Sequence, residues 1–319
     1  MKIVFMGTPD FAVPTLKALV QSGLRILSVV TQPDRPKGRG QEPHSPPVKQ
    51  FALEKGLAVL QPLSVNTPEF IEVLQRQEPD VVIVVAFGQI LSPKVLKIPR
   101  LACINLHASL LPKYRGAAPI NWAIIRGDGE TGVTTMKMDA GMDTGDILLA
   151  RKIPIQDSDN AQTLHDVLAS EGASLVLETV DCLEQNRLTP KPQDNSQATY
   201  APKLKKEDGF IQWTKRAVEI KNLVRGLEPW PGAYTFYKSR RLKICGVKVS
   251  TGDHGDVPGP IARTSDYGIE IGTGEGRLII TELQPEGKKR MSARDFLHGN
   301  PIGDRFDEFP HLPVSNLLL

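Results

Sequence analysis

The sequence predicts an α/β protein in which a doubly wound, mostly parallel sheet is followed by a smaller β-barrel domain. Continuous apolar runs, typical of strands buried on both faces, alternate with helical periodicity over the first 150 residues. Short β-like runs separated by Gly, Pro and Asp follow residue 230. The length of 319 residues, about twice that of a typical domain, agrees with two domains.

The N-terminal part contains short apolar runs that we predict as strands. They cover residues 2–6, 26–30, 57–60, 80–87 and 101–106. The spacing of Phe11, Leu16, Leu19 and Val20 predicts a helix between the first two strands. This alternation implies right-handed crossovers and a parallel sheet, whose functional residues are expected outside the carboxyl ends of the strands.

The chain changes character after residue 184. Two strands, 132–138 and 145–155, and a helix over 163–184 are predicted before that point. Residues 185–208 have three prolines, several lysines and little apolar periodicity, which is typical of a linker. Beyond it we predict a helix over 217–227 and the strands of a small barrel, at 233–237, 242–249, 268–271 and 278–283.

Composition excludes several classes of protein. A hydrophobic content of 40% and a charged content of 24% exclude global disorder. The three cysteines have neither disulfide-framework nor zinc-site spacing, which favours a reducing compartment. No signal-peptide profile and no apolar run of transmembrane length is present, so we expect a cytoplasmic protein that does not bind a membrane.

Positive charge is concentrated in two places. Residues 1–200 carry 20 basic and 21 acidic residues, a balance of −1, whereas residues 201–319 carry the remaining 19 and 15, a balance of +4. Residues 32–48 form a predicted loop with five prolines, two glycines and the cations Arg35, Lys37 and Arg39. A solvated, mobile insertion explains its composition, but its position after the second strand favours a function at the active edge of the sheet.

The common nucleotide motifs are missing. The turn after the first strand reads GTPDFA and lacks the later glycines of GxGxxG, on which backbone approach to a pyrophosphate depends. No GxxxxGK[ST] phosphate loop occurs either. These observations argue against a dinucleotide-dependent or ATP-dependent enzyme.

Asn105 and His107 are the best candidates for chemistry. They stand two apart at a strand end, so both side chains face one side, where His could transfer protons and Asn could donate to an oxyanion. On spacing alone, a hydrogen-bonded structural pair is the favoured explanation of these two residues. Asp139, Asp143 and Asp146 lack the order of a calcium loop, and we pair Asp143 with His107.

These motifs resemble the 10-formyltetrahydrofolate-dependent formyltransferases, and most fully the family that formylates methionyl-tRNA. The similar segments are GTPDFA, TQPDRPKGRG, VVAFGQIL, NLHASLLPKYRGAAPI, ETGVTTMKMDAGMDTGDIL, EPWPGAY and QPEGKKRMSARDFL, which together span nearly the whole chain. The resemblance implies a Rossmann-like catalytic domain at 1–188, a linker at 189–208 and an OB-like tRNA-binding domain at 209–319.

The resemblance also implies roles for particular residues. Asn105, His107 and Asp143 would be catalytic, with 10-formyltetrahydrofolate as the formyl donor, initiator methionyl-tRNA as the acceptor and no metal. Folate would be bound by two segments, and tRNA by the cations of the 32–48 loop. The folate residues are Phe87, Gly88, Gln89, Ile90, Leu91, Ser109, Leu110, Leu111 and Pro112, and the tRNA residues are Arg35, Lys37 and Arg39. We expect a monomer.

Three other functions share part of this pattern. Glycinamide ribonucleotide formyltransferases use similar chemistry, but their chains are expected to end near residue 200. Sugar-nucleotide formyltransferases would carry a different appended domain and bind a dTDP- or UDP-sugar. A non-catalytic RNA-binding module would have no need of Asn105, His107 and Asp143 together.

Overall fold

The computed structural model describes residues 1–37, 42–250, 258–300, 302–303 and 305–307, and they form two compact units. The first unit consists of Met1–Pro119, Glu130–Pro154 and Leu164–Pro202. The second unit consists of Ile120–Gly129, Ile155–Thr163 and the described residues from Lys203 onward.

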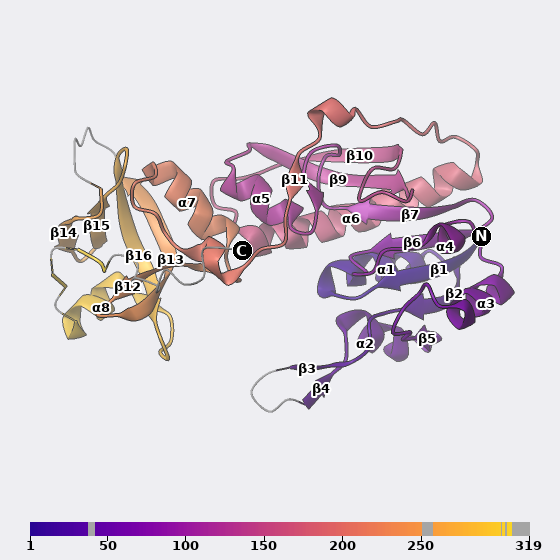
Figure 1. The fold of residues 1–319 in the computed structure, drawn as a ribbon, viewed down its shortest axis with the longest axis horizontal. Helices are drawn as coiled ribbons and strands as arrows, with labels where there is room; N and C mark the ends of the chain where they lie inside the picture. The colour runs from indigo at the N-terminus through magenta and orange to yellow at the C-terminus, as the bar shows by residue number, and fades with distance from the viewer. Residues whose placement is uncertain (38–41, 251–257, 301, 304, 308–319) are drawn as a thin grey trace, which may run out of the picture. The chain divides into compact units, whose positions relative to one another are not determined.

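A seven-stranded sheet forms the centre of the first unit, in the order β10-β9-β7-β6-β1-β2-β5 (Figure 1). Its parallel strands are β1 (Lys2–Gly7), β2 (Arg25–Val30), β5 (Val59–Leu60), β6 (Val81–Val85) and β7 (Ala102–His107). Next to β7, the last of the parallel strands, lies β9 (Glu130–Lys137), which runs antiparallel to β7 and to the edge strand β10 (Ile147–Pro154). The predicted doubly wound, mostly parallel sheet is confirmed.

The central strands read as unbroken apolar runs because helices cover both of their faces. All five residues of β6 are buried. On one face, Val82 and Val84 pack with α3 (Pro68–Gln77) and α4 (Pro93–Leu96) in a single apolar cluster. On the other face, α6 (Ala161–Glu184) lies against β9, where the Thr179 and Thr135 hydroxyls are 2.8 Å apart.

Proline begins several of the short helices of this unit, since its missing N–H needs no partner in a first turn. Such helices are α2 (Pro47–Glu54), α3 and α4, and α1 (Val13–Gln21) has proline at its second position, after the 3₁₀ turn η1 (Asp10–Ala12). Helix α5 (Pro119–Ile125), which belongs to the second unit from Ile120 onward, also begins with proline. Thr67 and Ser92 cap α3 and α4 by accepting hydrogen bonds from Phe70 N and Val95 N. These local signals, rather than long apolar periodicity, place the helices.

The 32–48 segment is more regular than the sequence predicts. It contains an antiparallel hairpin of β3 (Arg35–Lys37) and β4 (Glu42–His44), and α2 begins at Pro47. Pro36 lies opposite Pro43, which a two-stranded ribbon tolerates because neither position lies inside a larger sheet. The prediction of a segment without secondary structure is therefore wrong for its described residues.

The second unit is built on an antiparallel sheet in the order β12-β13-β16-β15-β14, with β17 paired to β16. Its elements are α7 (Ala217–Gly226), β12 (Ala233–Tyr237), β13 (Arg240–Ser250), β14 (Ile261–Ser265), β15 (Gly268–Gly272), β16 (Arg277–Pro285), β17 (Met291–Ser292) and α8 (Ala293–Gly299), after the 3₁₀ turn η3 (Lys206–Gly209). Within the described residues this sheet does not close on itself, so the OB-like barrel remains a prediction.

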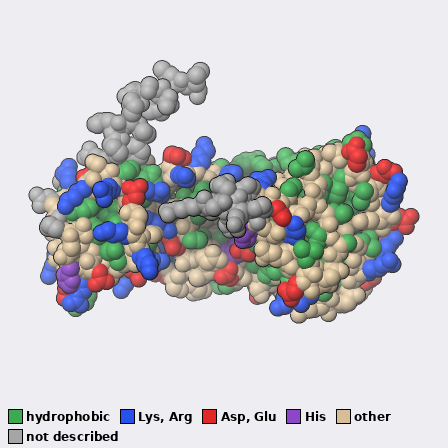
Figure 2. All heavy atoms as spheres, turned by 90° about the horizontal axis from the view of Figure 1, so that it is seen from below, with side chains coloured by type: hydrophobic (Ala, Val, Ile, Leu, Met, Phe, Trp, Pro, Cys, Tyr) green, Lys and Arg blue, Asp and Glu red, His purple; other side chains and the backbone are tan. Residues whose placement is uncertain are grey.

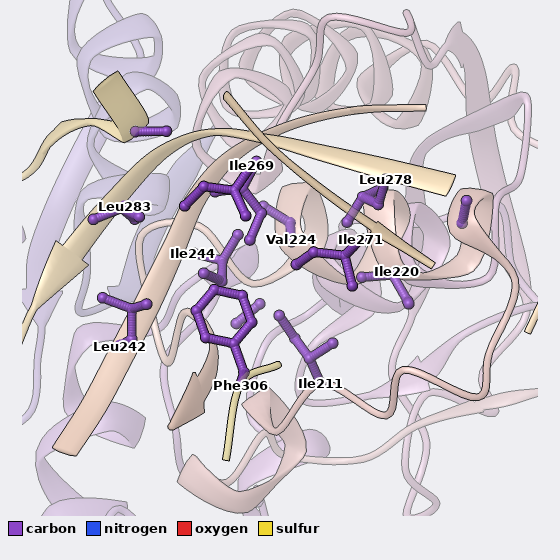
Figure 3. Packing of buried hydrophobic residues seen from close by; sticks show 14 of the residues in the cluster. Ile211, Ile220, Val224, Leu242, Ile244, Ile269, Ile271, Leu278, Leu283 and Phe306 are labelled. Atoms are coloured by element: carbon purple, nitrogen blue, oxygen red, sulfur yellow. The ribbon is translucent and has the colours of Figure 1, made fainter. Parts of the chain in front are cut away.

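One apolar core joins the sheet and the helices of the second unit. Strand residues such as Ile244, Ile271 and Leu278 pack with Ile220 and Val224 of α7 (Figure 3). These side chains are at most 3% exposed. The second unit therefore has a hydrophobic core of its own, as a domain requires.

Residues 191–201 pair with the first unit. Ile147 and Lys191 form an isolated antiparallel bridge, and β11 (Tyr200–Ala201) pairs in parallel with β8 (Arg115–Gly116). A 3₁₀ turn, η2 (Asn195–Gln197), lies between these contacts. This segment thus belongs to the first unit as far as Pro202, and the chain enters the second unit again at Lys203. Within the described chain, no helix combines the length and apolar character that crossing a bilayer requires.

Candidate active site

The end of β7 presents two polar side chains on one face of the sheet. Cys103, Asn105 and His107 alternate along the strand and so share the face that α3 and α4 cover further back. His107 is buried, whereas Asn105 is partly exposed. Among the described residues, no hydrogen bond holds the Asn105 side chain, so its amide is free to bind a ligand.

Hydrogen bonding determines which nitrogen of His107 can exchange a proton. Its Nε2 lies 2.8 Å from the carbonyl oxygen of Tyr114. A carbonyl oxygen can only accept, so Nε2 carries the hydrogen in this arrangement. The other nitrogen, Nδ1, lies 3.7 Å from Oδ2 of Asp143. This is too long for a hydrogen bond but close for an ion pair, so Nδ1 is the nitrogen available for proton transfer.

Asp143 is held in the turn between β9 and β10. Its backbone has a positive φ of 56°, and its Oδ2 accepts a 2.8 Å hydrogen bond from the backbone N–H of Gly116. Asp139 serves the turn itself, because its Oδ1 accepts from Gly141 N and from the Thr144 hydroxyl. The structure thus brings Asp143, and not Asp139, to His107.

Thr134 holds the segment that follows β7 in place through two hydrogen bonds. Its hydroxyl donates to the Ser109 carbonyl at 2.6 Å and accepts from Leu111 N at 3.2 Å. The buried Ser109 hydroxyl donates to the Lys113 carbonyl at 2.6 Å. Leu111 is buried, whereas Leu110 and Pro112 are partly exposed. Of the four residues predicted to contact folate here, Leu110 and Pro112 are therefore the more accessible to a ligand.

The other predicted folate segment follows β6. Phe87 and Leu91 belong to the apolar core, but Ile90 is 79% exposed. Gly88 has φ 86°, which favours glycine, and the space where a Cβ would stand is open. Gln89 accepts from Val65 N at 2.9 Å and donates to the Leu63 carbonyl, so it ties two loops together. Gly88 and Ile90 present the ligand-accessible surface of this segment.

Two of the three predicted tRNA cations, Arg35 and Lys37, belong to β3 of the β3–β4 hairpin. Arg35 is exposed, and the backbone of Lys37 pairs with that of Glu42. Arg39 lies outside the described residues. Asp34 anchors the base of the hairpin by accepting hydrogen bonds from Gln61, Lys49 and Ser45. The first two of these bonds hold the pKa of the Asp34 carboxyl below its usual range, which keeps it charged for this role.

Two alternative chemistries find no support in this geometry. Burial raises the pKa of the Cys103 thiol to about 12, so a thiolate nucleophile beside Asn105 is disfavoured at neutral pH. Within the described residues, no group of three His, Cys, Asp or Glu side chains is arranged to hold a metal. What remains is a free amide donor beside a His–Asp pair, an arrangement suited to acyl transfer.

Two residues that support the site, Gln193 and Thr199, are not predicted by any sequence pattern. Gln193 Nε2 donates to the carbonyls of Asp143 and Gly145, at 2.8 and 2.7 Å. Thr199 Oγ1 accepts from Tyr114 N at 2.9 Å. Both lie in an irregular stretch where no periodicity or motif indicates a role, and only the three-dimensional contacts reveal them.

Comparison with known proteins identifies the family. The formyl transferase family model matches residues 1–180, and the model of the formyl transferase C-terminal domain matches residues 203–301. The chain belongs to the formyl transferase family. A methionyl-tRNA formyltransferase of Geobacter sulfurreducens is 54% identical over 299 residues, which cover 94% of each chain.

Solved structures share the fold at lower sequence identity. WlaRD, a sugar 3N-formyl transferase solved with dTDP and 5-N-formyl-THF, has a TM-score of 0.68 and 21% identity over 91% of this chain and 99% of its own. HypX from Aquifex aeolicus, solved with tetrahydrofolic acid, has a TM-score of 0.63 and 18% identity over 93% of this chain. This chain spans only 47% of HypX.

Proposed function

We propose that this protein is a methionyl-tRNA formyltransferase, which transfers a formyl group from 10-formyltetrahydrofolate to the α-amino group of methionyl-initiator tRNA for translation initiation. The observation that carries the reaction type is the juxtaposition of the free Asn105 amide with His107 Nδ1, 3.7 Å from Asp143. The donor and the acceptor follow from membership of the family and from full-length similarity to methionyl-tRNA formyltransferases.

The chemistry assigns a separate task to each side chain. The attacking amine must be neutral, because an ammonium nitrogen has no lone pair. As its nitrogen bonds to the formyl carbon, the formyl oxygen becomes an oxyanion, to which the Asn105 amide and Nδ1 of protonated His107 donate. Each such donor contributes about 3–4 kcal/mol to transition-state stabilisation.

Proton transfer completes the exchange. The amine loses a proton when it is acylated, and N10 of the folate gains one when its bond to the formyl carbon breaks. Asp143 is suited to carry this proton through a water molecule, since Gly116 N–H orients its carboxylate beside His107. No further co-reactant is needed, because the proton lost by the amine is the one that N10 gains.

Binding of the two substrates is assigned to different surfaces. We assign folate to the segments 87–91 and 109–112, through their accessible residues Gly88, Ile90, Leu110 and Pro112. We assign tRNA to the cations Arg35, Lys37 and Arg39 and to the second unit, with domains at 1–188 and 209–319 joined by 189–208. Figure 2 shows Lys and Arg side chains spread among acidic ones on the visible face of the second unit. Contacts to phosphates would make this binding salt-dependent.

The direct test is formyl transfer from 10-formyltetrahydrofolate to methionyl-initiator tRNA. Elongator methionyl-tRNA serves as the matched control, and a dTDP-amino sugar represents the competing sugar formyltransferase activity. We expect transfer to initiator tRNA, much less to elongator tRNA and none to the sugar nucleotide. Transfer to the sugar nucleotide alone would overturn the proposal. Size-exclusion chromatography with light scattering tests the predicted monomer, and cell fractionation tests the predicted cytoplasmic location.

A further inference from the structure

The segment 191–201 lies beyond the family model of the catalytic domain, yet Gln193 bonds to Asp143, and Thr199 bonds to Tyr114, the hydrogen-bond partner of His107. It pairs with β10 at its start, through Lys191 and Ile147, and with β8 at its end, through β11. Between these two anchors lie Gln193, Asn195 and Thr199. The segment is therefore fixed on the first unit at both ends of the stretch that contacts the site.

A buried arginine determines how the Gln193 amide is oriented. Arg115 is 3% exposed, and its guanidinium donates to Gln193 Oε1 at 3.1 and 2.8 Å and to Asn195 Oδ1 at 2.8 Å. A guanidinium can only donate, so Gln193 must present its oxygen to Arg115. The Nε2 group of Gln193 is consequently directed away from Arg115, toward the turn that carries Asp143.

Both hydrogens of Gln193 Nε2 are used on that turn. They are donated to the carbonyl oxygens of Asp143 and Gly145, at 2.8 and 2.7 Å. Asp143 has a positive φ of 56°, a conformation that costs a non-glycine residue energy unless its surroundings stabilise it. Gln193 supplies such stabilisation at the backbone, while Gly116 N–H holds the carboxylate.

The same segment supports the His107 side of the pair. Thr199 Oγ1 accepts from Tyr114 N, and the Tyr114 carbonyl accepts from His107 Nε2. The Thr199 carbonyl accepts from Arg115 N at 2.9 Å, and the Ala201 carbonyl accepts from Ala117 N at 2.8 Å. These bonds fix the strand that includes Gly116, whose N–H orients Asp143.

We propose that Gln193 is a positioning residue of the active site, which holds the Asp143 turn so that the carboxylate faces His107 Nδ1. Gln193 acts through Asp143 and has no assigned contact with either substrate. The inference rests on the proposed formyl transfer, because its main effect is on the rate of that reaction.

The test compares Gln193→Glu with Gln197→Glu. The first change keeps an oxygen for Arg115 but directs a carboxylate oxygen, in place of the amide hydrogens, at two carbonyl oxygens. The second makes the same substitution four residues away, at an exposed side chain whose hydrogen bond, among the described residues, is to Asp194 and not to the Asp143 turn. We expect Gln193→Glu to lower kcat about 10- to 100-fold, as small displacements of catalytic groups do, with KM for tRNA changed less than about twofold. Gln197→Glu should behave as the wild-type enzyme.

A double-variant cycle separates positioning from general destabilisation. In an Asp143→Ala background, Gln193→Glu should lower kcat by less than about threefold further, because its effect passes through the missing carboxylate. If Gln193→Glu lowers kcat in the Asp143→Ala background by the same factor as in the wild-type enzyme, the inference is overturned. Equal kcat for Gln193→Glu and wild type would overturn it too. If the wild-type enzyme transfers no formyl group to methionyl-tRNA, the proposed function itself fails.

A structural readout does not depend on activity. We expect the crystal structure of Gln193→Met, which has similar volume and no hydrogen-bonding amide, to show the Asp143 carboxylate moved away from His107. An unchanged turn in that variant would contradict the inference. If Gln193→Glu does not fold, as judged by circular dichroism, Gln193→Met replaces it in the kinetic comparison and in the cycle.

Discussion

Replacing Gly116 with alanine should damage both the stability and the activity of the first unit. Gly116 has φ 120°, a conformation that L-residues rarely adopt, and an added Cβ would lie 2.7 Å from the carbonyl oxygen of Ala201. That carbonyl accepts the 2.8 Å hydrogen bond from Ala117 N that joins β8 to β11. The new methyl group must therefore either strain the backbone or separate the two strands.

The magnitude follows from these two effects. A strained backbone conformation costs about 1–3 kcal/mol, and the loss of one strand-pairing hydrogen bond about 1 kcal/mol. We expect Gly116→Ala to lower the free energy of unfolding of the first unit by about 2–4 kcal/mol. The Gly116 N–H also holds Asp143 Oδ2, so kcat should fall by about tenfold or more even where the variant is fully folded.

Urea unfolding followed by circular dichroism, together with steady-state formyl transfer, measures both effects. Gly129→Ala, in the second unit, is the control for a glycine-to-alanine change in itself, because the space around a Cβ at Gly129 is open and its φ is ordinary. The control should change stability by less than about 1 kcal/mol. If Gly116→Ala is as stable and as active as the control, the assigned roles of the β8–β11 pairing and of the Gly116 N–H are wrong.

Three further predictions concern other parts of the first unit. Arg39→Ala should weaken the use of methionyl-tRNA by about 1–3 kcal/mol in kcat/KM without changing folate affinity, and equal kcat/KM for tRNA would refute a role in binding. Hydrogen bonds from the Lys2 N–H and Arg100 lower the pKa of Asp80 in the folded protein. The charged carboxylate therefore stabilises the fold above the unfolded-state pKa of about 3.8, and this stabilisation is lost as the pH falls through the lower folded-state pKa. The difference in melting temperature between wild type and Asp80→Asn should thus be constant near pH 7 and shrink below about pH 4; a difference independent of pH would contradict this. Cys103, whose buried thiol has a raised pKa, should resist alkylation at pH 8 until the protein unfolds, which peptide mass spectrometry can follow, and rapid labelling of the folded protein would contradict its burial.

The sheet could be predicted because its central strands are continuous runs of apolar residues. An unbroken run such as Val81–Val85 is typical of a strand covered on both faces, and the structure places it at the centre of the seven-stranded sheet, between β1 and β7. Short helices such as α3 and α4 went unpredicted, because they depend on a capping hydroxyl and a first-turn proline more than on periodicity. The β3–β4 hairpin was missed because prolines in its strands argue against regular structure.

The candidate site was predictable only in part. The two-residue spacing of Asn105 and His107 places them on one face of a strand, and the structure also brings Asp143 within 3.7 Å of His107. The supporting contacts from Gln193 and Thr199 have no local signature, since each reaches the site from 50 or more residues away in sequence. Sequence patterns indicate groups on regular elements, but not the hydrogen bonds from irregular segments that orient them.

His107 is the residue on which the proposed chemistry most depends. The most direct measurement is the single-turnover rate of formyl transfer to methionyl-initiator tRNA, at saturating 10-formyltetrahydrofolate, for the wild-type protein and His107→Ala. Removal of a group that acts on transition-state charge should lower this rate by at least about 10², while folate and tRNA binding largely remain. A folded His107→Ala protein with a nearly unchanged rate would contradict the assignment of this site as the centre of formyl transfer.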